Sequence, residues 1–356
     1  MFRFNVPLIP DQPYIDDLNR LGERIYAVHF SLHQPILADA RVRLHTRGLQ
    51  PMVRALRGVP AARKYLLANS RFQLDKLYRS GSSLTRLIEF LEQLLAGDVL
   101  HGIVFSDGYL LKALSDAAPQ MAACLEAIPS INFMIDSASK LSAVLALVGS
   151  SNFLMPGKIT LDRSLNRRPG ALADLAALIR KRHAGMRIEL LANEGCLNHC
   201  PFRATHEALI AAANTGAPMD TFRQNRDLGC VRIMSEAPHR ILASPFIRPE
   251  DLQHYTDVAD IIKICGRTLG STFLRRAVAA YAAGKFTGNL FDLLDASHWM
   301  GERWELANHR LPEDLYERLV SCDQNCTVCD ACAKQFQQHA RALPVALKTF
   351  DQNKIS

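Results

Sequence analysis

Short apolar runs alternate along the chain with longer segments in which apolar residues recur at helical spacing. Residues 84–95, LTRLIEFLEQLL, place their apolar side chains on one helical face, and the same spacing predicts helices over 170–181 and 272–283. Branched and aromatic apolar runs predict strands over 2–7, 25–30, 65–69, 102–106, 131–135, 158–161, 188–192, 240–244 and 260–265.

This alternation predicts βα units with a parallel sheet, and therefore an α/β fold. We expect a (β/α)8 TIM-barrel-like domain over residues 1–310, followed by a short Cys-rich C-terminal extension over 311–356. Nine candidate strands are one too many for eight positions, so either 240–244 or 260–265 is expected outside the ring. The composition changes near Leu311-Pro312, and no strand is expected beyond that point.

The composition suits one large domain, since 48% of the 356 residues are hydrophobic. No apolar run reaches the roughly 18 residues that a membrane helix needs. The first residues, MFRFNVPLIP, lack a signal-peptide pattern, so we expect a cytoplasmic protein with no membrane span. The net charge of +7 would suit RNA or an anionic metabolite as a partner, although the basic residues are scattered along the sequence.

Polar residues recur where the predicted strands end. Catalytic groups of such barrels lie on the loops after the strands, so these positions are candidate site residues. Each of them alone is more often a helix cap or a surface group, and only their recurrence favours a function. The candidate catalytic residues are Asp162, Arg163, Asn193, Glu194 and Arg203. Other polar residues at predicted strand ends are His29, Ser31, Asn69, Asp107 and Asp136.

Four of the nine cysteines form a compact run near the C-terminus. Clustered thiols in a reducing compartment bind metal or carry redox chemistry more often than they form disulfides. Thiolates are soft ligands that suit iron–sulfur clusters or zinc, but zinc sites favour two pairs separated by a longer insert. The run therefore favours a four-iron (4Fe–4S) cluster, with zinc as the alternative. Its members are Cys322, Cys326, Cys329 and Cys332.

A second cysteine group follows the predicted strand over 188–192. Cys196 and Cys200 are three residues apart, a spacing that occurs by chance, but Cys230 lies in the next long connection. Cys265, at another strand end, could add a fourth thiolate. Cys124 stands in the apolar stretch MAACLEAI and is expected to be a core thiol.

Several well-known motifs are absent from the sequence. It contains no phosphate-binding P-loop, no H-E-x-x-H and no G-x-S-x-G, which argues against a nucleotide triphosphatase, a zinc protease or an α/β-hydrolase. Cys322, Cys326 and Cys329 have the spacing found in radical SAM enzymes. In those enzymes the motif follows the first barrel strand, whereas here it follows the barrel, so this interpretation is disfavoured.

Segments at the predicted strand ends, taken in order, resemble the peptidase U32 family between residue 2 and about residue 295. The segments are IYAVHFS (25–31), YLLAN (65–69), KITLDRSLN (158–166), the cysteine-bearing stretch 188–200, ASPFIRPEDL (243–252) and KICGR (263–267). The chain departs from the family pattern at Cys265, which replaces a glutamate. It also departs in the close Cys196/Cys200 pair and in the C-terminal cysteine run. The resemblance therefore indicates a divergent branch.

Relatives in this family bind a four-iron cluster through four cysteines, despite the peptidase label. They act in oxygen-independent hydroxylation of tRNA or rRNA bases or of the ubiquinone ring. The resemblance thus implies that Cys196, Cys200 and Cys230 hold a cluster, with Cys265 or a tail cysteine as the fourth ligand. One or two such clusters are expected in the chain.

The resemblance further implies an iron–sulfur oxidoreductase that hydroxylates, or otherwise modifies by redox chemistry, an RNA base or a small aromatic metabolite. Arg163, Arg167 and Arg203 would face anionic groups of the substrate, because arginine makes forked contacts with carboxylate and phosphate. Two alternatives remain open. One is a peptidase, and the other is a non-catalytic electron-transfer or scaffold subunit that works with a homologous partner or an electron donor.

Overall fold

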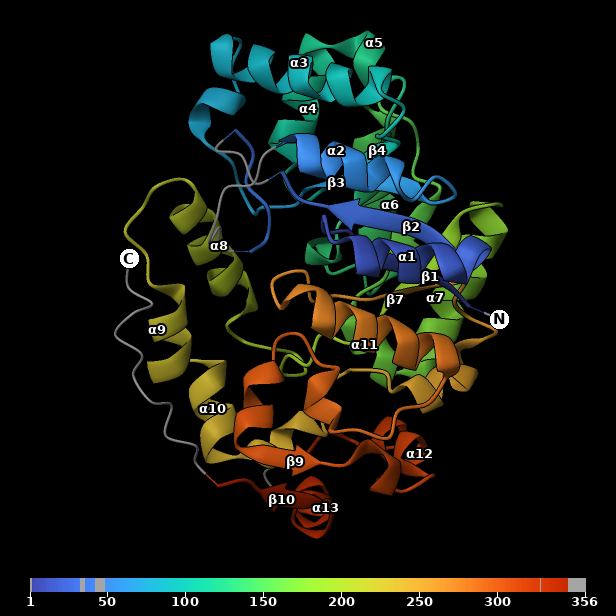
Figure 1. Ribbon diagram of the computed structural model, residues 1–356, viewed down its shortest axis with the longest axis vertical. Coiled ribbons are helices and arrows are strands. Elements are labelled where there is room, and N and C mark those ends of the chain that lie inside the picture. The colour runs from blue at the N-terminus through green and yellow to red at the C-terminus, as the bar shows by residue number, and fades with distance from the viewer. Residues whose placement is uncertain (1, 33–35, 42–48, 327, 345–356) are drawn as a thin grey trace.

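Eight parallel strands form the centre of the molecule, which is a nearly closed (β/α)8 TIM-barrel-like fold, as predicted (Figure 1). The computed structural model describes residues 2–32, 36–41, 49–326 and 328–344. The strands are β1 (Arg3–Pro7), β2 (Ile25–Phe30), β3 (Arg63–Ala68), β4 (Gly102–Phe105), β5 (Glu126–Pro129), β6 (Lys158–Thr160), β7 (Arg187–Leu191) and β8 (Ile261–Lys263). Their order is β5-β4-β3-β2-β1-β8-β7-β6. Leu154 bridges to Glu126 in parallel fashion and narrows the gap between β5 and β6.

The α-helices lie mainly between consecutive strands. They are α1 (Gln12–Leu21), α2 (Leu49–Arg57), α3 (Ser82–Ala96), α4 (Gly108–Ala117), α5 (Pro119–Ala122), α6 (Ala138–Gly149), α7 (Pro169–Arg182), α8 (Arg203–Asn214), α9 (Thr221–Asp227), α10 (Cys230–Glu236), α11 (Gly270–Ala283), α12 (Leu315–Val320) and α13 (Ala331–His339). The three predicted helices are confirmed as α3, α7 and α11. In α3, Leu84, Leu87, Leu91 and Leu94 are buried at the helical spacing that predicted the element.

Single 3-10 turns complete the connections. They are η1 (Gly22–Arg24), η2 (Asp75–Leu77), η3 (Ile131–Phe133), η4 (Arg163–Arg167), η5 (Pro238–Ile241), η6 (Pro249–Tyr255), η7 (Leu290–Asp292), η8 (His298–Glu302) and η9 (Asn308–Arg310). Within the described residues, no helix is long and apolar enough to cross a membrane. The cytoplasmic location stays a prediction.

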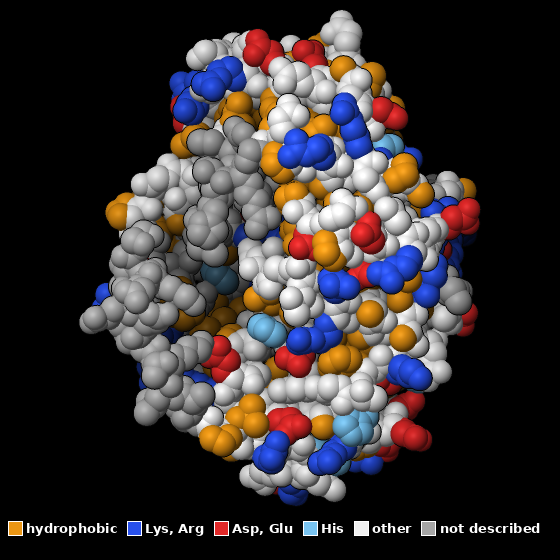
Figure 2. Space-filling model, in the orientation of Figure 1, with side chains coloured by type: hydrophobic (Ala, Val, Ile, Leu, Met, Phe, Trp, Pro, Cys, Tyr) orange, Lys and Arg blue, Asp and Glu red, His pale blue; other side chains and the backbone are white. Residues whose placement is uncertain are grey.

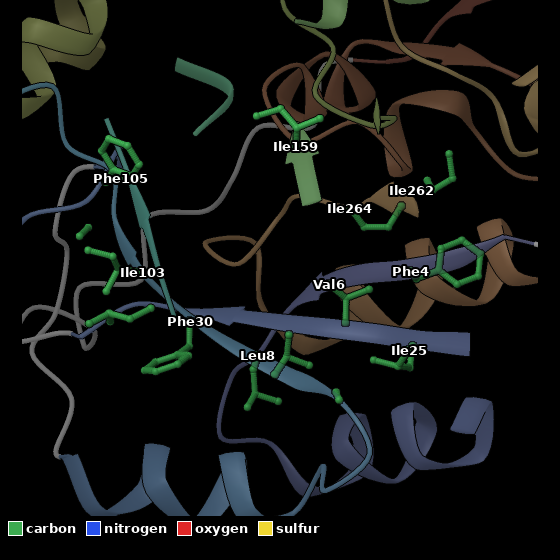
Figure 3. Close-up of a cluster of buried hydrophobic side chains, with 14 of the residues drawn as sticks. Phe4, Val6, Leu8, Ile25, Phe30, Ile103, Phe105, Ile159, Ile262 and Ile264 are labelled. Atoms are coloured by element: carbon green, nitrogen blue, oxygen red, sulfur yellow. The ribbon is translucent and has the colours of Figure 1, made fainter. Parts of the chain in front are cut away.

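The main hydrophobic core lies between the outer face of the strands and the helices. Phe4 and Val6 of β1 and Phe30 of β2 are fully buried there (Figure 3). Burying one such side chain contributes about 1.5–3 kcal/mol, so this layer is the principal source of stability in the barrel.

The inner face of the barrel combines a small apolar cluster with a buried polar network. Glu189 of β7 accepts hydrogen bonds from Asn5 Nδ2, Lys158 Nζ and Thr160 Oγ1, each at 2.7 Å. Lys263 Nζ stands 3.9 Å from the same carboxylate. The apolar cluster includes Ala27, Tyr65, Leu67, Val104, Ile128 and Ile261.

Two of the predicted strands are wrong. Residues 131–135 begin with the turn η3, and the fifth strand lies earlier, at Glu126–Pro129. β5 reads EAIP, and the glutamate and proline break the apolar run by which the other strands were predicted. The Glu126 carboxylate is satisfied by Arg63 and by Tyr65 Oη at 3.2 Å. Residues 240–244 lie in and after η5, so this candidate is the one outside the ring.

The expectation for Cys124 is also wrong. This residue lies in a turn after α5, is exposed, and donates its thiol to the Gln120 carbonyl at 3.5 Å. The four-residue helix α5 ends at Ala122, so the apolar stretch does not continue as a buried helix past Cys124.

The C-terminal region packs on a second apolar cluster. Phe336 of α13 meets Trp304 edge to face, with ring centroids 5.2 Å apart. β9 (Trp304–Leu306) pairs in antiparallel fashion with β10 (Ala340–Ala342), so the expectation of no strand after residue 312 is wrong. Figure 1 shows β9, β10 and α13 together at one end of the molecule. The division at residues 310 and 311 stays a prediction, and residues on both sides of it share this cluster.

Candidate functional site at the barrel mouth

Asn193 fixes the loop that carries the first cysteine pair. It is fully buried, and its Nδ2 donates to the carbonyls of Cys265, at 3.1 Å, and Leu293, at 2.9 Å. Its Oδ1 accepts from the Cys265 backbone N–H at 2.7 Å. Asn193 therefore ties the loop after β7 to Cys265 just after β8, and its contacts are those of a positioning residue.

Two glycines stand directly beside the thiols. Gly195 has φ +74°, and a Cβ there would lie 2.3 Å from Ser297 Oγ. Gly266 has φ +124°, and a Cβ there would lie 2.1 Å from the Phe273 ring. Only glycine adopts such backbone angles at little cost, so the positions of Cys196 and Cys265 depend on these two residues.

Cys196, Cys200 and Cys230 lie close enough for their charges to interact, and Cys200 and Cys230 pack against the second apolar cluster. Burial raises the pKa of Cys196, the nearby guanidinium groups of Arg163 and Arg41 lower it, and the neighbouring Cys230 and Cys200 raise it further. Cys265 is also partly buried, and burial raises the pKa of its thiol. The Arg41 guanidinium forms an ion pair with Asp295 and interacts electrostatically with both Cys196 and Cys265.

The candidate catalytic residues pair with acceptors inside the protein. Arg163 forms an ion pair with Glu194. Arg203 Nη1 contacts Asp162 at 2.6 Å, and its Nη2 donates to the Ile131 carbonyl at 2.7 Å. Burial alone would raise the pKa of Asp162, but Arg203 and the hydrogen bonds from Ser164 hold that pKa below its usual value. These pairs link the ends of β6 and β7 to α8.

The four tail cysteines are among the residues that line a cavity of about 580 Å³. Burial and the three other tail thiols together raise the pKa of Cys332 to about 11. Asn198, between Cys196 and Cys200, donates to Gln324 Oε1 at 3.1 Å. Cys200, Cys230 and Cys332 all pack against the second apolar cluster. The two thiol groups therefore lie on one scaffold.

No three His, Cys, Asp or Glu side chains in the described ranges already stand in a metal-holding arrangement. The chemistry of the donor set nevertheless fits an iron–sulfur cluster. Partly buried thiols gather near Arg41 and Arg163, whose charges would offset those of thiolate ligands.

Sequence reasoning missed Arg41, Asp295 and Ser297. Arg41 and Asp295 are 254 positions apart and form no local motif. Only the glycine before Cys196 offered a signal, because a glycine beside a functional residue often marks close approach of the backbone.

Comparisons with known proteins give one curated relative and one solved structure of note. No protein-family model matches the chain. The chain is 32% identical over 176 residues to "Uncharacterized protease MJ1657" of Methanocaldococcus jannaschii, a match that covers 49% of this chain and 50% of that protein. The chain thus aligns with about half the length of this curated relative.

The solved structure is described as "The Structure of the U32 Peptidase Mk0906". It has a TM-score of 0.48 and 15% identity, and the match covers 74% of this chain and 92% of that one. The curated relative is named a protease, and the similarity to it is limited to the matched 176 residues.

Proposed function

We propose that this chain is an iron–sulfur protein of the U32 type that performs oxygen-independent hydroxylation, or a related redox modification, of an RNA base or a small aromatic metabolite. The observation that carries the proposal is the gathering of Cys196, Cys200 and Cys230 at the barrel mouth, with Cys265 beside the same Arg41. Chemistry in this fold occurs at that end of the barrel.

Cys196, Cys200, Cys230 and Cys265 would hold the cluster in the proposed enzyme. When bound, such a cluster supplies one-electron transfer, or a Lewis-acidic iron where one coordination position is left open.

The chain's own residues position and neutralise this centre. Gly195 and Asn193 fix the loops that bear the thiols. Arg41 and Arg163 place positive charge beside Cys196, which favours anionic thiolates and anionic substrate groups. The Arg163–Glu194 ion pair joins the ends of β6 and β7 beside Cys196.

The partner class is inferred from charge and position. The net charge of +7 favours a polyanion or an anionic metabolite. On the face seen in Figure 2, the described Lys and Arg side chains are scattered among acidic and neutral ones. Binding through a few arginines at the barrel mouth therefore explains substrate selection better than a broad basic surface on that face.

The first test is metal content after anaerobic purification. The wild-type protein should contain iron and sulfide and show broad visible absorption, and the Cys196→Ser/Cys200→Ser variant should lose iron. Cys124→Ser is the matched control, because Cys124 is an exposed thiol in a turn after α5 and should be dispensable for the centre. Wild-type protein that contains only zinc would refute the proposal.

The second test is the reaction itself. Mass spectrometry of RNA nucleosides and of aromatic metabolites from cells that lack the protein should reveal a compound short of one oxygen atom. The wild-type gene should restore the oxygenated form of this compound, and the Cys196→Ser/Cys200→Ser variant should not. Peptide hydrolysis by metal-free protein, abolished in the same variant, would support a peptidase instead.

A further inference from the structure

The cavity beneath the tail combines four thiols with a buried arginine from the barrel. Its wall includes Cys322, Cys326, Cys329, Cys332 and Arg167. Arg167 belongs to η4 and is 4% exposed. The cavity therefore joins the C-terminal run to a loop at the mouth of the barrel.

Two of the three guanidinium nitrogens of Arg167 are hydrogen-bonded, and the third is not. Its Nε and Nη2 donate to the Ser244 carbonyl at 3.2 and 2.7 Å, and its guanidinium carbon lies 5.2 Å from the centre of the Phe246 ring. Its Nη1 is buried and has no hydrogen-bond partner among the described residues. A buried donor without a partner is unfavourable, and Arg167 lines the cavity, so this N–H calls for an acceptor held there.

The charges on the cavity wall favour an anionic acceptor for Arg167 Nη1, and the four thiols restrict which group can bind there. Arg240, Arg318 and Lys334 also line the cavity, so its wall carries an excess of positive groups. Arg318 and Lys334 are partly offset by Asp314 and Asp330, whereas Arg167 Nη1 keeps its unpaired N–H. An iron–sulfur cluster with four thiolate ligands is anionic, and its sulfurs accept hydrogen bonds.

We propose that the tail cavity holds a second, self-contained four-iron cluster, with Cys322, Cys326, Cys329 and Cys332 as its four ligands and Arg167 Nη1 as a hydrogen-bond donor to a cluster sulfur. All four tail cysteines line the same cavity, so none is left to complete the barrel-mouth site. Cys265 is then the fourth ligand of that site. Ligand ordering and metal binding are coupled, so the tail thiols close around the cluster as it binds.

This site does not depend on the proposed function, and one experiment separates the two. Iron and sulfide are counted in the anaerobically reconstituted full chain, in Cys326→Ser/Cys329→Ser and in Cys196→Ser/Cys200→Ser. Each pair of substitutions should remove about half of the iron, and each should leave the other cluster's electron paramagnetic resonance signal in place.

The iron counts distinguish the tail cluster from the barrel-mouth cluster. Iron that survives in full in Cys326→Ser/Cys329→Ser, or zinc in place of iron at the tail, overturns the second cluster. If instead only the tail variant loses iron, the second cluster stands and the barrel-mouth proposal fails.

The role of Arg167 has its own readout. Hydrogen bonds to cluster sulfurs raise the reduction potential, so Arg167→Gln should shift the potential of the tail cluster to a more negative value. The barrel-mouth cluster should keep its potential. Arg318→Gln is the control, because Arg318 lines the same cavity but is half exposed and pairs with Asp314. An unchanged tail potential in folded Arg167→Gln protein would refute the assignment of Arg167. The iron counts test the cluster even if that variant does not fold.

Discussion

Replacing Glu189 by Gln should destabilise the barrel more than any exposed charge substitution. The Glu189 side chain is fully buried and is the common acceptor for Asn5, Lys158 and Thr160. Glutamine has nearly the same shape, so the substitution removes the charge without creating a cavity. The buried lysine then has no carboxylate partner.

The size of the effect follows from the burial of both partners. Lys158 and Glu189 are each 0% exposed, and their charged atoms are 2.7 Å apart. Breaking a buried pair by removing one partner costs about 3–5 kcal/mol, because the remaining charge stays buried without compensation. For a chain of this size, about 2 °C in Tm per kcal/mol gives a fall of roughly 6–10 °C.

The assay is urea denaturation followed by circular dichroism, with a thermal scan alongside. Asp75→Asn is the control, because Asp75 pairs with Arg79 on the surface and should cost no more than about 0.5 kcal/mol. The double variant Glu189→Gln/Lys158→Met should recover part of the loss, since it removes the uncompensated charge. If Glu189→Gln costs no more than Asp75→Asn, the network does not bear on stability and the argument from burial fails.

Two further predictions follow from the same structure. Gly195→Ala should cost about 1–3 kcal/mol and lower the metal content, because its Cβ would meet Ser297 Oγ at 2.3 Å at a φ of +74°. Gly185→Ala, with φ +90° but open space around it, is the control that isolates the clash and should keep the wild-type metal content. The second prediction concerns pH. Burial lowers the pKa of Lys158 to about 8, against the opposing pull of Glu189, so the unfolded chain binds more protons between about pH 8 and 10. Stability from this group should therefore rise with pH across that window in wild-type protein, and urea midpoints of Lys158→Met should lack that rise. A wild-type profile that falls there in step with the variant would contradict the prediction.

The barrel could be predicted wherever a strand has an apolar signature of its own. β4 reads GIVF and β2 reads IYAVHF, and both are buried along their whole length. β5 reads EAIP, and its glutamate is tolerated because Arg63 and Tyr65 of β3 and the Gly157 backbone N–H pair with it. The partners of Glu126 are distant in the sequence, so no local pattern predicts this strand.

The segment over 240–244 illustrates the opposite error. Ile241 and Leu242 are fully buried, as expected for residues of a central strand. They belong to the second apolar cluster, however, and not to the sheet. The preceding Pro238 opens η5, and Ser244 Oγ donates to the Cys196 carbonyl at 2.6 Å. Hydrophobic periodicity predicts that a side chain is buried, but it does not predict in which of two apolar clusters the side chain lies.

The cysteines were visible in the sequence because ligand spacing is local, whereas their surroundings were not. The second apolar cluster is what brings Cys200 and Cys230 of the barrel loops beside Cys332 of the tail, and Asn198 joins the same loops to Gln324. Residues that share one core cannot be ordered independently. Because ligand ordering and metal binding are coupled, the proposed cluster in the tail cavity would also stabilise the loop that bears Cys196 and Cys200. We therefore expect the C-terminal extension to support the loop that bears Cys196 and Cys200.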